Sequence, residues 1–342
     1  MLDTSGNPTR TVRDRTPART VAVFTAGLAA LAVCVLLSLA LGTRAVDPGT
    51  VLGALGGTDH SRDALAVTGI RVPRTIIGLV VGAALGLAGA VAQGVTRNPL
   101  ASPTTLGVNA GAALAVVTAI YVLHLTRPAE FLPFAFGGAA LAALAVFALA
   151  RGGGDLDPVR LALSGTVLAS VLTGWTSALM LANERTLDEA RFWLVGSLAG
   201  RSLDMLGPVA IPLAVGALLA FAVAPALNAL GLGDESAAAL GVPVTRTRLL
   251  GGASVVLLAA SAVAVAGPIA FIGLAAPHLV RPFTGPDHRL VLPACLLAGP
   301  VLLLSADILG RMLLRPTEIE VGIVTAFLGA PLLAILARKA AR

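Results

Sequence analysis

The chain has 342 residues, of which 56% are hydrophobic and only 12% are charged. A soluble chain carries about 25% charged residues, so this one has too little charge to cover a globule of its size. The composition excludes a soluble enzyme, a nucleic-acid-binding domain and a disordered regulator. The net charge of +6 comes from basic residues spread along the chain in ones and twos, which is not the clustered pattern of a nucleic-acid-binding surface.

Apolar runs long enough to cross a bilayer recur along the chain, since about 20 helical residues span about 30 Å of hydrocarbon. They fall near residues 21–42, 72–95, 106–123, 131–150, 159–182, 207–230, 249–266, 290–310 and 317–338. A shorter apolar segment lies at 268–280. It begins at the Gly267-Pro268 break, where proline interrupts helical hydrogen bonding. The sequence predicts an all-α polytopic membrane protein with about ten transmembrane helices, some of them short or broken.

The two halves of the chain share a plan. Each combines long spans with one short apolar segment, 106–123 or 268–280, near a break rich in proline and glycine. Inverted repeats of this kind build many transporters, so we expect two inverted five-helix halves. Basic residues are slightly more numerous on the side that this topology makes cytoplasmic, and both chain ends are basic. We therefore expect a cytoplasmic polar tail at 1–20, one transmembrane domain at 21–338 and a cytoplasmic C-terminal tail at 339–342.

Several kinds of catalytic site lack their residues. The only lysine is Lys339, and no glycine-rich phosphate-binding run precedes it, so the chain cannot be a P-loop ATPase. Cys34 and Cys295 both lie in apolar runs, and no two histidines stand at i, i+4 spacing. We expect neither enzymatic activity nor a metal site.

Small residues and one acid mark positions inside the spans. Gly78, Gly82 and Gly86 form a ridge at four-residue spacing, which lets another helix approach closely; a glycine-lined pathway is the alternative reading. Asp307 is costly at membrane depth unless it is paired or hydrated. Arg311 lies at i+4, the favourable spacing for an ion pair on a helix. A local pair is therefore preferred over a proton-relay role for Asp307.

The loop at 231–248 is predicted to be cytoplasmic and to hold a short helix. Asp234, Glu235 and Ser236 supply capping and first-turn acidic residues, the run from Ala237 to Leu240 forms the helix, and Gly241 ends it. A short helix of small residues fits a groove on a partner protein. An ordinary loop helix on the membrane surface is the alternative.

This loop resembles the coupling region of permease subunits from ABC importers for ferric siderophores, haem and cobalamin, the FecCD-type family. The resemblance extends over residues 21 to 338 through motifs in the family's order. The first are Arg71-Val-Pro-Arg74, Gln93-Gly-Val-Thr-Arg-Asn-Pro-Leu-Ala101, Leu106-Gly-Val-Asn-Ala-Gly111 and Phe192-Trp-Leu-Val-Gly-Ser-Leu198. The later ones are Gly267-Pro-Ile-Ala-Phe-Ile-Gly-Leu-Ala-Ala-Pro-His-Leu-Val-Arg281, Ala306-Asp-Ile-Leu-Gly-Arg311 and Leu328-Gly-Ala-Pro331.

The resemblance implies a complex in the bacterial inner membrane. Two permease subunits pair around one path, two ATPase subunits that carry ATP-Mg bind the cytoplasmic face, and a solute-binding protein docks outside. It assigns docking to Arg71, Arg74 and Arg311 and an inner gate region to Asp157, Pro158 and Val159. It assigns ATPase coupling to Asp234, Glu235, Ser236, Ala237, Ala238, Ala239, Leu240 and Gly241.

Two other functions compete with this one. A secondary transporter or channel needs an intramembrane ionisable site, for which Asp307 is the one candidate. An intramembrane enzyme needs a cluster of histidine and acidic residues at ligand spacing, which is lacking. The expected cargo is an iron-siderophore-type chelate, ahead of haem or cobalamin. Pairing as a homodimer or a heterodimer stays open.

Overall fold

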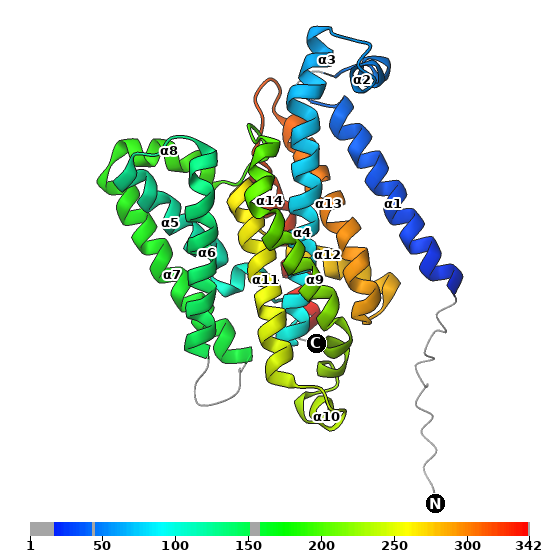
Figure 1. The fold of residues 1–342 in the computed structure, drawn as a ribbon, viewed down its shortest axis with the longest axis vertical. Coiled ribbons are helices and arrows are strands. Elements are labelled where there is room, and N and C mark those ends of the chain that lie inside the picture. Colours follow the sequence, from blue (N-terminus) through cyan, green and yellow to red (C-terminus); the bar gives the residue numbers. More distant parts are fainter. Residues whose placement is uncertain (1–16, 43–44, 151–157, 341–342) are drawn as a thin grey trace, which may run out of the picture.

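A computed structural model describes residues 17–42, 45–150 and 158–340, and this part of the chain is all helical (Figure 1). Most of the predicted tail at 1–20 therefore lies outside the described residues. The α-helices are α1 (Pro17–Ala40), α2 (Pro48–Leu55), α3 (Arg62–Ala66), α4 (Val72–Thr96), α5 (Val108–Leu123), α6 (Pro128–Ala150), α7 (Pro158–Ala182), α8 (Glu184–Leu194), α9 (Gly207–Leu230), α10 (Asp234–Ala239), α11 (Val244–Ala266), α12 (Ile272–Thr284), α13 (His288–Leu313) and α14 (Val321–Ala340). A π-helical turn (Val67–Arg71) leads into α4, and 3₁₀ turns precede α5 (Pro103–Leu106) and α9 (Leu203–Leu206).

Seven helices in the described part are long and apolar enough to cross a membrane. The all-α membrane fold predicted from the sequence is thereby confirmed. Helix α5, helix α12 and the portion of α14 up to Pro331 are shorter. The 13 residues of α12 rise only about 20 Å at 1.5 Å each. The count of ten crossings and the inverted relation of the two halves stay predictions.

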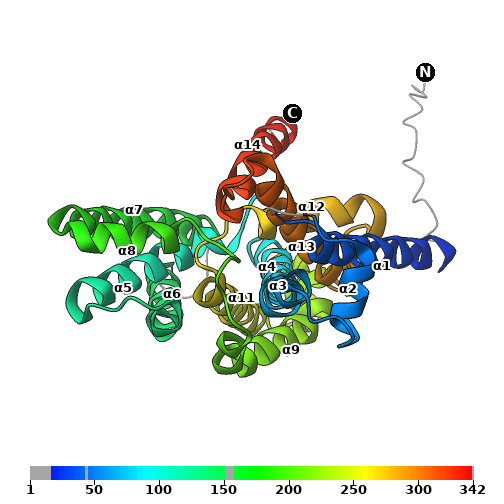
Figure 2. The ribbon, with the colours of Figure 1, turned by 90° about the horizontal axis from the view of Figure 1, so that it is seen from above.

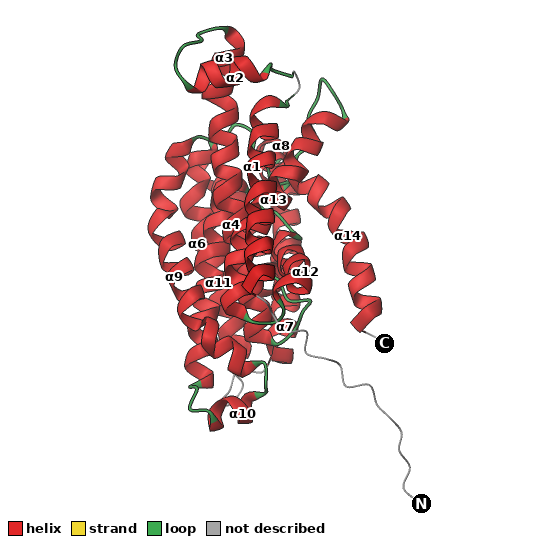
Figure 3. Cartoon of the chain, turned by 90° about the vertical axis from the view of Figure 1, so that its right-hand side faces the viewer, coloured by secondary structure: helices red, strands yellow, loops and turns green. Residues whose placement is uncertain are grey.

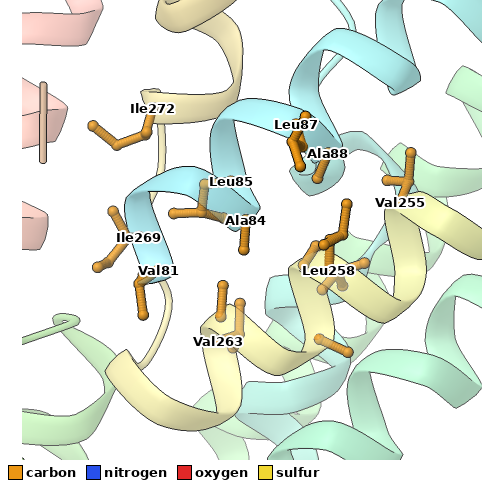
Figure 4. Close-up of a cluster of buried hydrophobic side chains, with 14 of the residues drawn as sticks. Val81, Ala84, Leu85, Leu87, Ala88, Val255, Leu258, Val263, Ile269 and Ile272 are labelled. Atoms are coloured by element: carbon orange, nitrogen blue, oxygen red, sulfur yellow. The ribbon is translucent and has the colours of Figure 1, made fainter. Parts of the chain in front are cut away.

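Helix α4 lies at the centre of the bundle, and α9, α11, α12 and α13 surround it (Figure 2). Its apolar side chains meet those of α11 and of the segment that leads into α12. Figure 4 shows Val81 and Leu85 of α4 among Val263, Ile269 and Ile272. A helix that is buried on nearly all sides needs no polar face, which explains why its sequence carries almost none.

The glycines of α4 bring it close to α13. A Cβ atom added to Gly78 would lie 2.6 Å from the Leu304 side chain, and one added to Gly82 would lie 2.6 Å from Cα of Pro300. One added to Gly86 would lie 2.6 Å from a backbone oxygen of α13. These separations are far below van der Waals contact, so the two helices pack backbone against backbone along this ridge, as small residues permit.

Three short helices lie between the predicted spans. Each begins at a side-chain cap: the side chains of Asp47, Ser61 and Asn183 accept a hydrogen bond from a backbone N–H in the first turn of α2, α3 and α8. Such caps satisfy backbone groups that a helix end leaves unpaired. Helix α8 is amphipathic and buries Ala190 and Trp193 against the bundle.

The short helices mark the two ends of the molecule. Helices α2, α3 and α8 lie toward one end, and α10 lies at the other (Figures 1 and 3). We refer to these as the α3 end and the α10 end. Helix α14 runs from the α3 end toward the α10 end along the outside of the bundle, as Figure 3 shows.

Candidate functional site

A network of buried charges joins three parts of the chain near the α3 end. Nε of Arg74 on α4 donates to both carboxylate oxygens of Asp307 on α13 at 3.1 Å, and its Nη2 donates to one of them at 2.8 Å. Nη1 of Arg74 donates to Glu318 at 2.7 Å. Arg311 reaches the second oxygen of Asp307 at 3.0 Å. Arg74 and Arg311 therefore share the buried carboxylate of Asp307, and Glu318 supplies a second negative charge to Arg74.

Two arginines of this region donate hydrogen bonds to carbonyl groups at the C-terminal end of α1. Nη1 of Arg71 donates to the carbonyls of Leu39 and Ala40, both at 2.7 Å. Nη1 of Arg311 donates to the carbonyl of Ser38 at 3.0 Å. The last carbonyls of a helix lack intrahelical partners, and cations interact favourably with that end of the helix dipole. The two side chains thus fasten α1 to α4 and α13.

These contacts do not support the docking role that the resemblance assigned to the arginines. Arg71, Arg74 and Arg311 are 9%, 6% and 2% exposed, whereas docking requires guanidinium groups that a partner can reach. The docking role stays a prediction. The local pair of Asp307 with Arg311 is confirmed. A carboxylate held by two cations also gives no support to a proton relay.

A further buried cation lies in the segment between α8 and α9. Arg201 donates to the carbonyl of Ser197 at 3.3 Å. Burial lowers its pKa to about 10, and the charge of Glu320 acts in the opposite direction. Arg201 therefore stays protonated at neutral pH.

The short helix predicted from Ala237 to Leu240 is observed as α10, but it begins earlier, at Asp234, and ends at Ala239. The residue before it is Gly233, at φ 107° and with no side-chain cap. Asp234 does not cap: it accepts two hydrogen bonds from Arg248 at 3.0 Å and lies 3.5 Å from Arg97. The carboxylate instead ties α10 to α11 and to the end of α4, because both arginines project toward it. The expected capping role of Asp234 was therefore wrong.

Part of the α10 region is exposed at the protein surface. Ala239 and Leu240 are exposed, whereas Ala237 is buried. Beside them lies a groove of about 790 Å³ that includes Asp234, Glu235, Ala238, Val242, Pro243, Val244, Thr245, Arg246 and Leu249. Helix α10 and this groove together form a compact surface of small and charged side chains.

The chain leaves helical geometry where Gly267-Pro268 predicted a break. Helix α11 ends at Ala266, and α12 begins only at Ile272. Gly267 has φ 76°, a region that favours glycine. An added Cβ there would lie 2.5 Å from the carbonyl oxygen of Trp193, so the break also packs against α8.

A groove of about 550 Å³ lies between α7, the turn before α5 and the start of α12. Its lining combines hydroxyl and apolar side chains and, among the described residues, no charge: Leu100, Ser102, Thr104, Thr105, Gly165, Thr166, Ala169, Ser170, Thr173, Ala270, Phe271 and Leu274. Thr166 and Ser170 each donate to a carbonyl one turn earlier. Such a surface suits passage, because a site that conducts must hold its cargo weakly enough to release it.

The predicted gate region is only partly visible. Asp157 lies outside the described residues, Pro158 is the first residue of α7, and Val159 is exposed. No group of three or more histidine, cysteine, aspartate or glutamate side chains in the described part could hold a metal ion.

Sequence reasoning missed several residues of these sites. Glu318 and Ser38 complete the charge network from distant parts of the chain, and neither lies in a pattern that links it to Arg74. The hydroxyls of α7 carried a usable signal, since Thr166, Ser170 and Thr173 repeat at helical spacing on one face.

Long apolar helices packed closely around a glycine-rich central helix identify a polytopic membrane protein. The chain belongs to the FecCD transport family, whose sequence model matches residues 30–339. The family suggested by the sequence motifs is thereby confirmed.

Relatives and a solved structure agree with this assignment. The ferric enterobactin transport system permease protein FepD of Escherichia coli is 47% identical, over 91% of this chain and 93% of FepD. The Fe(3+)-citrate import system permease protein YfmD of Bacillus subtilis is 40% identical, over 89% of this chain and 90% of YfmD. A metal-chelate type ABC transporter solved in an inward-facing conformation is 29% identical, with a TM-score of 0.78 over 94% of this chain and 99% of the other.

Proposed function

We propose that this permease carries an iron-siderophore-type metal chelate across the inner membrane of a bacterium as part of an ATP-driven importer. The observation that carries the proposal is the 47% identity to the ferric enterobactin permease over nearly the whole of both chains. Relatives named for ferric citrate and for cobalamin are 40% and 41% identical. The iron chelate is favoured because the most similar of these three relatives is named for one.

The path for the chelate runs, in this proposal, along α7 between two permease subunits. The membrane-spanning part of α7 is 11% buried within the single chain, which leaves most of its surface for lipid or a second subunit. The face with Thr166, Ser170 and Thr173 lines the uncharged groove. Polar side chains at membrane depth are expected to face protein or water, which supports a second subunit across this groove.

The α10 end is the cytoplasmic side in this proposal, and the ATPase subunits bind there. The chain lacks a phosphate-binding lysine motif, so ATP-Mg is held by those subunits. The coupling surface is the helix Asp234–Ala239 with Leu240 and Gly241. Its support is the exposure of Ala239 and Leu240 beside a groove that an ATPase can occupy.

The solute-binding protein docks at the α3 end in this proposal, which is then the outer face. Both chain termini are cytoplasmic, and the gate region at 157–159 lies on the cytoplasmic side. The docking role of Arg71, Arg74 and Arg311 requires release of the internal bonds that these side chains make. Exposed charges of α3 and α8, among them Arg62 and Arg185, offer contacts that need no release.

Transport by the reconstituted complex tests the cargo. The permease, its ATPase and its binding protein are placed in vesicles, and uptake of ferric enterobactin, ferric citrate and cobalamin is compared at equal concentration. We expect ATP-dependent uptake of an iron chelate and none of cobalamin. Uptake of cobalamin alone would overturn the proposed cargo while leaving the ATP-driven mechanism in place.

A further inference from the structure

Phe271 has an unusual backbone conformation inside the membrane domain. It lies in the break before α12 with φ 69° and ψ −30°. Two other described residues besides glycine have positive φ, Arg97 and His124, and both end helices. A bulky residue with positive φ is strained, and such strain persists only where the surroundings enforce it, often at functional sites.

Contacts on two sides fix this residue. Its carbonyl oxygen accepts hydrogen bonds from the N–H groups of Leu274 at 3.0 Å and Ala275 at 2.8 Å, so the first turn of α12 depends on it. Its ring lies against Gly329 of α14, so closely that a Cβ atom added to Gly329 would overlap the ring carbons. The ring is therefore seated on the backbone of α14 and cannot retreat in that direction.

Phe271 also belongs to the lining of the uncharged groove beside α7. Among the described residues that line this groove, Phe271 is the only aromatic one, and the rest are small, aliphatic or hydroxylated. The groove has a volume of about 550 Å³. A flexible side chain in its wall could move aside for a bulky solute, whereas a rigid aromatic ring cannot.

We propose that Phe271 is a specificity-determining residue that sets the width of the translocation path. Gly329 is a positioning residue, because its backbone packs against the ring. The strained backbone and the contact with α14 keep the ring at a fixed place while cargo passes over the hydroxyl face of α7. The cargo class that this arrangement selects is a bulky chelate that just clears the ring. The inference rests on the proposed function, because the groove must form part of the path.

The direct test measures space and does not depend on the identity of the cargo. Ser170, exposed on α7 and part of the groove lining, is replaced by cysteine in the complete complex. Its labelling rates with a small and a bulky maleimide are then compared. The chain without this substitution gives the background, because Cys34 and Cys295 are buried.

We expect Phe271→Ala to raise the labelling rate of the bulky reagent at least tenfold and to leave that of the small reagent nearly unchanged. Gly329→Ala pushes the ring toward the groove and lowers the bulky rate. The double variant Phe271→Ala with Gly329→Ala recovers it, because the clash is gone. Phe283→Ala, which truncates an exposed phenylalanine of α12, serves as the control and leaves both rates unchanged.

An unchanged ratio of the two rates in Phe271→Ala, or no recovery in the double variant, would overturn the inference. Uptake of ferric enterobactin provides a second readout, which Gly329→Ala lowers and the double variant restores. If the wild-type complex does not take up this chelate, the proposed cargo fails, but the labelling rates still decide the role of Phe271.

Discussion

The guanidinium of Arg74 and the carboxylate of Asp307 form a forked ion pair across 233 positions of the sequence. Asp307 is 1% exposed, and Arg311 contacts its second oxygen. The pair joins α4 to α13 beyond the glycine ridge, at the place where these helices reach the α3 end. Because the bidentate geometry fixes orientation as well as distance, it sets the alignment of these two closely packed helices.

Removal of the carboxylate that Arg74 and Arg311 share should strongly lower the free energy of unfolding. Asp307→Asn leaves two buried cations close together, and breaking a buried pair by removing one partner costs about 3–5 kcal/mol. Glu318→Gln should cost far less, about 1 kcal/mol at most, because the side chain of Glu318 is 31% exposed and its ion pair is with Arg74. Thermal unfolding of the two purified variants gives the comparison, and equal melting temperatures would contradict the central place of Asp307.

Arg71 should stabilise the packing of α1 against the rest of the bundle. Arg71→Gln removes the charge at the end of the helix and weakens two hydrogen bonds, so we expect a loss of about 1–3 kcal/mol seen as a lower melting temperature. Arg62→Gln, an exposed arginine of α3, is the matched control and should leave stability unchanged. An unaltered melting temperature for Arg71→Gln together with weaker attachment of the binding protein would instead favour docking.

The glycine ridge should be intolerant of a single methyl group. Gly82→Ala places a Cβ against the backbone of Pro300, and overpacking of this kind costs about 1–3 kcal/mol. Gly137→Ala on α6 meets nothing within 4 Å and should be neutral or slightly stabilising, since alanine is the better helix former. Thermal unfolding of both variants in one detergent measures this difference, and equal stability of Gly82→Ala and Gly137→Ala would contradict the close packing of α4 against α13.

The exposed residues of the α10 surface should matter for assembly and little for folding. Leu240→Asp places a charge on this surface without disturbing buried Ala237, so the ATPase should co-purify at least tenfold less well and uptake should fall with it. Leu52→Asp alters an equally exposed leucine at the α3 end and should leave ATPase binding intact. Normal pull-down of the ATPase by Leu240→Asp would exclude this surface as the coupling element.

The parts of the fold that depend on length and periodicity could be predicted from the sequence. Apolar runs located the long helices, and Gly267-Pro268 located the break, because both signals are local. The short helices α2, α3 and α8 escaped prediction because their stability comes from single capping side chains and contacts with the bundle. The partners of Arg74 escaped as well, since nothing local in the sequence brings Glu318 to it.

The same limit explains the corrected details of the candidate sites. Asp234 stands where a capping residue belongs, yet Arg248 and Arg97 draw its carboxylate away from the helix end. Arg71, Arg74 and Arg311 lie near one end of the bundle, as expected, but their burial is a tertiary property that spacing does not reveal. Motifs in series identified the family, while the roles of individual side chains required the structure.

ATP-driven import is tested by uptake of ferric enterobactin into vesicles that hold the permease and its binding protein, with and without the ATPase. We expect accumulation only when the ATPase and ATP-Mg are both present, and none when the ATPase carries a mutated phosphate-binding lysine. Accumulation at the same rate without the ATPase, driven by an ion gradient, would contradict ATP-driven import and identify a secondary transporter.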